Sequence, residues 1–125
     1  MYDLIVKGGT VVDPSQNLHA VNDVAIEDGK IAKIAPDISS NEAKRVVEVK
    51  GKVVTPGLID IHTHVYSGVT DNGVDPDIGG VRAGVTTMVD AGSSGCDTFN
   101  GFPAHIIPNT ATEIIVFLHI CRTGL

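Results

Sequence analysis

The chain has 125 residues, a mass of 13.0 kDa and a net charge of −6. Its apolar fraction of 42% and charged fraction of 19% are typical of a globular protein and exclude an intrinsically disordered chain. The acidic balance argues against a nucleic-acid partner, because phosphate binding needs a basic face, and the apolar runs are too short to cross a bilayer. The chain opens without a signal-peptide pattern, and two cysteines cannot build a disulfide scaffold, so we expect a reduced, cytoplasmic protein.

The composition changes near the middle of the chain. Residues 1–55 have a net charge of −1 and residues 56–125 one of −5, and four of the five histidines lie in the second part. A Pro-Gly pair, Pro56 and Gly57, stands at the change and is a strong break in regular structure. We therefore expect two domains, residues 1–55 and residues 56–125.

The first part has the pattern of short β-strands. Its Asp28-Gly29 pair suits a two-residue hairpin turn, because both central positions of that turn take positive φ. Gly8-Gly9 and Asp13-Pro14 mark further bends. The predicted strands are short, rich in β-branched residues and bounded by turn residues: 4–6, 11–12, 24–26, 30–34 and 46–49.

The second part alternates strands with helical segments. Residues 58–62 form a near-continuous apolar run, which is typical of a strand buried on both faces, and residues 85–90 and 114–120 predict two more strands. A helix is expected over 76–83, with Asp75 as N-cap, Pro76 at its first position and Gly84 as its stop. Mixed turn and helix is expected over 98–109. This alternation predicts an α/β fold with parallel strands.

The stretch Asp60-Ile61-His62-Thr63-His64 carries the clearest chemistry. Alternate residues of a strand share a face, so His62 and His64 project together. They lie at the carboxyl end of the apolar run, where α/β folds open onto a ligand crevice. Neutral imidazole suits zinc and other first-row metals. By itself the pair also fits ordinary surface or core histidines.

Residues 54–64, with the sequence VTPGLIDIHTH, resemble the opening signature of the amidohydrolase superfamily. The resemblance implies the start of a (β/α)8 TIM-type barrel over residues 56–125, incomplete in this chain, preceded by part of a small β-sandwich over residues 1–55. It also implies that His62 and His64 hold a divalent metal, with zinc as the first choice and one or two ions in the site.

The implied activity is hydrolysis of an amide or ester bond, N-acyl or O-acetyl, by metal-activated water. In the superfamily the other metal ligands and the catalytic acid and base come from later strands, beyond residue 125 here. We therefore expect an N-terminal part of the enzyme that by itself binds metal poorly and lacks activity. The expected partners are a small-molecule substrate and, as in many superfamily members, further copies of the same chain.

Within the superfamily the chain is most similar to the dihydroorotase-like branch. Residues 73–77, 84–95 and 99–102 resemble the deacetylase-type members. Cyclic amidases such as dihydroorotases place an arginine shortly after the second histidine, whereas residues 65–68 read VYSG here. A cyclic amidase of the dihydroorotase or hydantoinase type remains an alternative, as does a non-catalytic relative.

Five further residues are candidates to orient a ligand or to touch substrate. Asp60 shares the face of the histidine pair, and Tyr66 follows the pair closely. Asp90 ends the second predicted strand on the ligand side, and Ser93 and Ser94 lie in the Gly-Ser-Ser-Gly loop after it. A structural buried aspartate and a plain turn are the alternatives.

Overall fold

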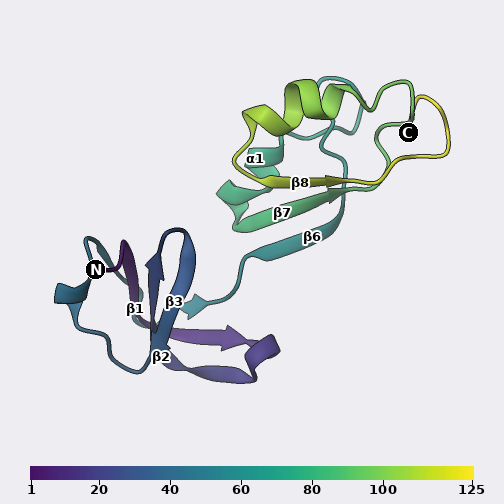
Figure 1. The fold of residues 1–125 in the computed structure, drawn as a ribbon. Helices are drawn as coiled ribbons and strands as arrows, with labels where there is room; N and C mark the ends of the chain where they lie inside the picture. The colour runs from purple at the N-terminus through teal and green to yellow at the C-terminus, as the bar shows by residue number, and fades with distance from the viewer. The chain divides into compact units, whose positions relative to one another are not determined.

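The computed structural model describes residues 1–125 as two compact units, Met1–Pro56 and Gly57–Leu125 (Figure 1). The first consists of strands and two short 3₁₀ turns, whereas the second alternates strands with short helical segments. None of the helices is long and apolar enough to cross a membrane.

The first unit is a five-stranded sheet with the order β3-β2-β1-β4, and β5 pairs with β1 as well. Strands β1, β2 and β3 are antiparallel neighbours, whereas β4 and β5 run parallel to β1. The strands are β1 (Leu4–Asp13), β2 (Leu18–Glu27), β3 (Lys30–Ala35), β4 (Val46–Glu48) and β5 (Val53–Val54). The predicted strands 4–6 and 11–12 are therefore two ends of one long strand.

The turn between β2 and β3 is the predicted hairpin. Asp28 and Gly29 have φ values of 51° and 72°, so both central positions take the left-handed conformation. The bend expected at Gly8-Gly9 is a shift in the pairing of β1 with β2, and it lies between Val6 and Gly9. Gly8 has φ of 75° there, which accounts for a glycine within a strand.

The first unit has a small apolar core and a largely buried ion pair. Ile5 of β1, Ala25 of β2 and Ile38 are almost completely buried. Asp23 is also buried, and its Oδ2 lies 2.7 Å from Lys7 Nζ. Burying a carboxylate is costly unless it is paired, so this contact makes the burial of Asp23 tolerable.

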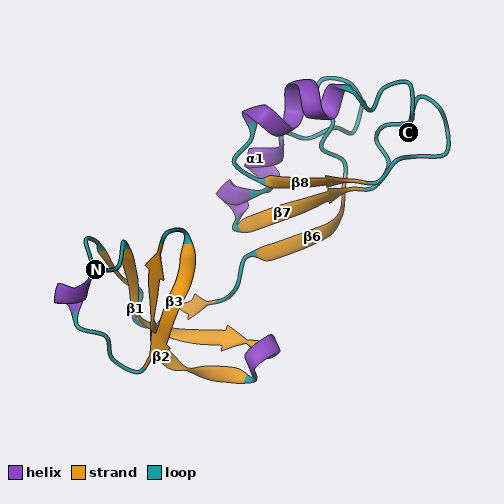
Figure 2. Ribbon diagram, viewed as in Figure 1, coloured by secondary structure: helices purple, strands orange, loops and turns teal.

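The second unit contains a three-stranded parallel sheet with the order β6-β7-β8 (Figure 2). Helical segments connect the strands, so the alternation expected of an α/β fold is present. The elements are β6 (Leu58–Thr63), α1 (Pro76–Gly79), η3 (Val81–Ala83), β7 (Val85–Asp90), η4 (Phe102–Ile106), η5 (Ile107–Asn109) and β8 (Glu113–Val116).

The helix expected over 76–83 begins and ends as predicted but is broken in the middle. The Asp75 side chain accepts two backbone N–H groups of the first turn, and Gly84 ends the segment with φ of 90°. Gly80 separates α1 from η3 with φ of −92° and ψ of −113°. A Cβ at Gly80 would lie 2.2 Å from Thr112 Oγ1, so the break brings the backbone against the segment before β8.

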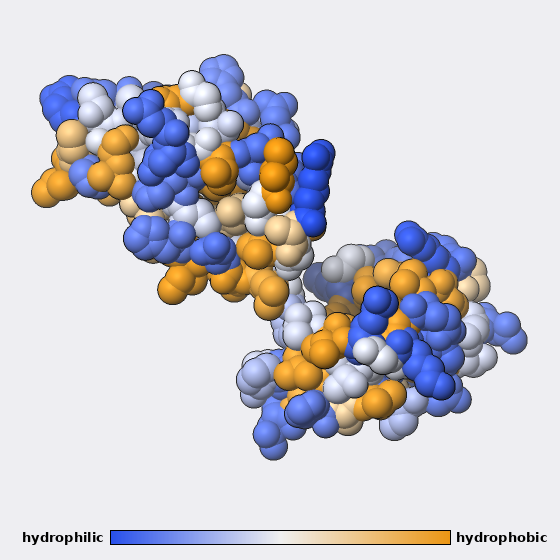
Figure 3. Space-filling model, turned by 180° about the vertical axis from the view of Figure 1, so that it is seen from behind, coloured by the Kyte–Doolittle hydropathy of each residue, from blue (hydrophilic) through white to orange (hydrophobic).

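Two expectations for the second sheet were wrong. Residues 58–62 were expected to be buried on both faces, but Ile59 and Ile61 are 61% and 75% exposed. The reason is that β6 is an edge strand, and little in this chain covers its side chains. The third strand was expected to reach residue 120, but β8 ends at Val116, and Phe117 and Leu118 are exposed. Exposed apolar side chains appear as orange areas in Figure 3.

The core of the second unit is formed by β7, the segment that follows β6, and η4. It consists of Val65, Tyr66, Met88 and Phe102, all buried. Since Val65 and Tyr66 directly follow the histidine pair, this core anchors the chain that leaves β6.

Candidate metal centre

The two histidines lie at the carboxyl end of β6. His62 is within the strand and exposed, and His64 is half-buried just after it. Their ring centroids are 5.7 Å apart, with the ring planes at 78°. Two imidazoles on one tetrahedral zinc ion, at Zn–N distances of about 2.0–2.1 Å, have ring centroids roughly 5 Å apart. The observed centroid separation is close to this value.

Thr63, between the histidines, fastens the end of β6 to β7. Its side chain is buried, and its Oγ1 donates to the Val89 carbonyl at 3.0 Å. Its own carbonyl accepts the N–H of Ala91 at 2.8 Å. Two hydrogen bonds of Thr63 thus hold the backbone between the histidines against β7 and the residue that follows it.

Asp90, at the end of β7, joins the two loops that follow the strands. It is completely buried. Its Oδ2 accepts the N–H of Val65 at 2.8 Å, and its Oδ1 accepts the N–H groups of Gly92 and Ser93 at 3.1 and 2.7 Å. Asp90 therefore fixes the position of Ser93 relative to the residue after His64.

Ser93 and Ser94 are both completely buried, but their side chains have different surroundings. Ser93 Oγ lies 2.9 Å from Nδ1 of His64. The hydroxyl of Ser94 has no hydrogen-bond partner. Of the two candidate serines, the structure brings only Ser93 into contact with the histidine pair.

Asp60 and Tyr66 make other contacts. Asp60 is exposed, and its Oδ1 accepts the backbone N–H of His62 at 3.1 Å rather than a ring N–H. Tyr66 is buried, stacks on Phe102 with ring centroids 4.3 Å apart, and donates its hydroxyl proton to the Thr98 carbonyl. The structure thus places Tyr66 in the core beneath the loops.

An ion pair that no sequence pattern predicted links the loop after β7 to the segment after β8. Arg122 donates through Nε and one terminal nitrogen to the two oxygens of Asp97, at 2.9 and 2.8 Å. The guanidinium holds the pKa of Asp97 below its usual range. Because 25 residues separate the partners, only the folded chain reveals the contact.

The histidine pair is not part of a larger ligand cluster. Nowhere in residues 1–125 do three or more His, Cys, Asp or Glu side chains gather closely enough to hold a metal ion. The chain therefore offers two imidazole donors at the end of β6, whereas a zinc site takes three or four protein ligands.

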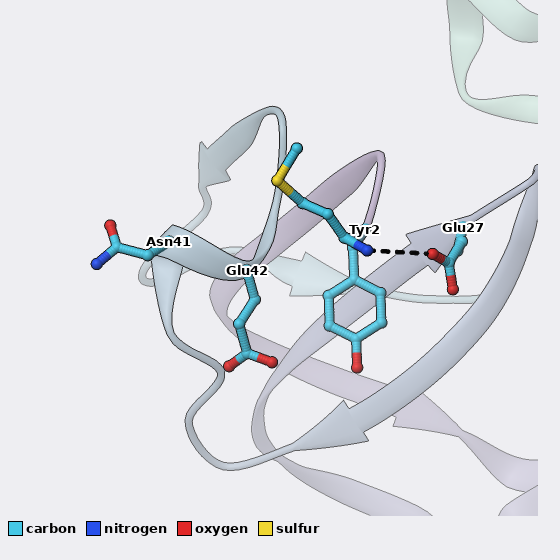
Figure 4. A pocket seen from close by; sticks show the side chains of 5 residues that line it. Tyr2, Glu27, Asn41 and Glu42 are labelled. Carbon is cyan, nitrogen blue, oxygen red and sulfur yellow. Dashed lines mark ion pairs between the residues drawn. The ribbon is translucent and has the colours of Figure 1, made fainter.

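A separate pocket in the first unit does not supply metal ligands of this kind. It is lined by the first two residues together with Glu27, Asn41 and Glu42 (Figure 4). The N-terminal amine lies 3.6 Å from Glu27 Oε1. The pocket contains neither imidazole nor thiol, the donors that zinc prefers.

Comparisons with known proteins give this arrangement a context. A deacetylase of Agrobacterium fabrum is 38% identical over 98 residues, which is 78% of this chain and 24% of that protein. The crystal structure of a dihydroorotase matches with a TM-score of 0.87 and 30% identity over 100% of this chain and 33% of that one. A D-aminoacylase with a binuclear metal centre matches with a TM-score of 0.59 and 35% identity over 78% of this chain and 19% of that one. No family model matches the chain.

Parallel strands joined by helical segments, with a histidine pair at the carboxyl end of the first strand, define an α/β sheet of the kind that begins a barrel. The relatives specify it further. The chain is homologous to the N-terminal portion of proteins of the amidohydrolase superfamily, and its sheet is an incomplete barrel with three strands. It spans about a quarter of the deacetylase and a third of the dihydroorotase.

Proposed function

We propose that the protein is a metal-dependent amidohydrolase that cleaves an N-acyl or O-acetyl bond of a small molecule, with His62 and His64 as two of its metal ligands. The observation that carries the proposal is the histidine pair, with ring centroids 5.7 Å apart at the carboxyl end of a parallel strand. Its support from relatives is the similarity to a deacetylase over 78% of the chain.

The donor chemistry favours zinc as the metal. Imidazole is a preferred zinc ligand, and His64 has one ring nitrogen engaged by Ser93, which leaves the other for a metal. When bound, the metal would polarise the scissile carbonyl and lower the pKa of an attacking water. The chain's own contribution is to hold the two imidazoles on a strand end whose backbone Thr63 and Asp90 fix.

The same proposal assigns roles to the two units. We take Met1–Pro56 as part of the β-sandwich domain and Gly57–Leu125 as the first three strands of the barrel. Two exposed free cysteines suit a reducing, cytoplasmic setting. A small-molecule substrate follows from the reaction class, and assembly into a homo-oligomer is part of the proposal because the superfamily members are often oligomers.

A cyclic amidase is the second candidate, favoured by the TM-score of 0.87 with a dihydroorotase. The segment after His64 speaks against it, because Val65, Tyr66, Ser67 and Gly68 offer no arginine for a substrate carboxylate. Hydrolysis rates of N-acetyl amino acids and of dihydroorotate, measured with the product of the complete open reading frame that encodes this chain, distinguish the two. Faster turnover of dihydroorotate would favour the cyclic amidase.

The metal site can be tested on the 125-residue chain itself. We expect Co²⁺ to broaden the imidazole NMR signals of His62 and His64 at lower concentrations than those of His19, His105 and His119. His62→Ala should weaken this broadening at His64, whereas His105→Ala, an exposed histidine, should leave it unchanged. Equal broadening of all five histidines would contradict the proposed site.

A further inference from the structure

We propose that Ser93 is a positioning residue that holds Nδ1 of His64 and thereby presents Nε2 as the nitrogen for the metal. The inference rests on the proposed metal site, and it concerns a residue that is not itself a ligand. Its basis is the 2.9 Å contact between Ser93 Oγ and His64 Nδ1.

An imidazole has two ring nitrogens, and the hydrogen bond made by one of them decides which nitrogen is left to bind a metal. In metal sites the nitrogen that does not bind metal usually donates its proton to a nearby oxygen, which fixes the ring orientation. A hydroxyl both donates and accepts hydrogen bonds, so Ser93 Oγ can accept a hydrogen bond from the Nδ1–H of His64 when Nε2 is used for a metal. Ser93 is completely buried, so its hydroxyl is not itself exposed to solvent.

The position of Ser93 does not depend on His64. Asp90 holds the Ser93 backbone N–H at 2.7 Å and, through its other oxygen, the N–H of Val65 at 2.8 Å. The turn between Asp90 and Ser93 needs Gly92, whose φ is 100° and whose added Cβ would lie 3.1 Å from His119. The buried carboxylate of Asp90 therefore positions Ser93 and also the backbone of Val65, the residue that follows His64.

Ser94 provides a matched control within the same loop. It is as buried as Ser93, but its hydroxyl has no partner. Removing that hydroxyl leaves the contact to His64 intact, so Ser94→Ala and Ser93→Ala differ in this one interaction.

The experiment compares the 125-residue chain with Ser93→Ala and Ser94→Ala, each with ¹⁵N-labelled histidine. In the parent chain at saturating Zn²⁺, which two donors bind only weakly, we expect the His64 ring ¹⁵N shifts of a metal-bound Nε2 and a protonated Nδ1. In Ser93→Ala we expect altered His64 shifts even without metal, and Zn²⁺ binding about 10-fold weaker or more. Ser94→Ala should match the parent in both measurements.

The outcomes separate this inference from the proposed function. If His62→Ala and His64→Ala weaken Zn²⁺ binding but Ser93→Ala leaves both binding and the His64 shifts unchanged, the positioning role is wrong and the metal site stands. If the histidine variants themselves leave Zn²⁺ binding unchanged, the metal site is wrong. Equal changes in Ser93→Ala and Ser94→Ala would indicate general loosening of the loop and would also overturn the inference.

Discussion

The two units bury polar side chains in different ways. In the first unit the carboxylate of Asp23 in β2 pairs with Lys7 and accepts the N–H groups of Gly8 and Ile38. These contacts join β2 to the neighbouring strand β1 and to the segment after β3. In the second unit the carboxylate of Asp90 joins two loops at the ends of parallel strands. The contacts of Asp23 stabilise the sheet of the first unit, whereas those of Asp90 position the loop residues next to His64.

The difference follows from strand direction. Antiparallel hairpins bring residues close in sequence together, so their polar contacts serve the sheet itself. Parallel strands place all their carboxyl ends at one edge, where the following loops meet. The buried carboxylate of Asp90 thus lies at the candidate site, whereas that of Asp23 makes a structural contact.

The largest expected effect comes from removing the carboxylate between the loops. Asp90→Ala leaves three backbone N–H groups without their acceptor, and a buried unpaired donor costs about 1–3 kcal/mol each, so we expect a loss of about 3 kcal/mol or more. Amide hydrogen exchange at Met88, whose N–H does not bond to Asp90, measures it. Asp60→Ala is the control, since Asp60 is exposed and accepts one N–H. Similar losses in both variants would contradict the role of Asp90.

A smaller effect is expected from the ion pair of the first unit. Asp23→Ala should destabilise that unit by about 2–3 kcal/mol, because the N–H groups of Gly8 and Ile38 lose their acceptor while Lys7 retains its contact with Asp37. Amide exchange at Ala25 reports this loss. Asp37→Asn removes the exposed partner of the same lysine and should change little. A larger effect of Asp37→Asn would show that the exposed contact dominates.

The same pair makes the stability of the first unit depend on pH. Burial alone would raise the pKa of Asp23, but Lys7 and the two backbone N–H groups outweigh it and hold the pKa below its ordinary value of 3.8. Because the folded-state pKa of Asp23 lies below the ordinary pKa of 3.8, the stabilisation is fully present above 3.8 and is lost as the pH falls from there through the folded-state pKa. Asp23→Asn should therefore flatten the acid dependence of exchange at Ala25.

The smallest effect compares two glycines, one from each unit. Gly29 and Gly84 have φ of 72° and 90°, and a Cβ added at either would meet no atom within 4 Å. Alanine should therefore cost about 1 kcal/mol at each position from backbone strain alone. Urea unfolding of Gly29→Ala and Gly84→Ala measures this cost, and Gly29→Asn should lose less because asparagine tolerates positive φ. A neutral Gly84→Ala would show that the strain is relieved in the second unit.

The sequence by itself determined the local features of the chain. The Asp28-Gly29 turn, the cap at Asp75 and the alternation of strands and helices were predicted because φ preferences and side-chain periodicity act over a few residues. The spacing of His62 and His64 likewise predicted that the rings lie close together, as their 5.7 Å separation shows. Their assignment as metal ligands remains a prediction.

Only the tertiary structure decided which polar residues meet the histidines. Ser93 and His64 are 29 residues apart, and Asp90 and Val65 are 25 apart. These contacts depend on how β6 pairs with β7, and that pairing shifts between Asp60 and Thr63. No local pattern encodes such a shift, so Ser93 and Ser94 look alike in the sequence and differ in the fold. The exposure of Ile61 was also decided by the tertiary structure. Burial depends on what packs against a strand, and β6 is an edge strand.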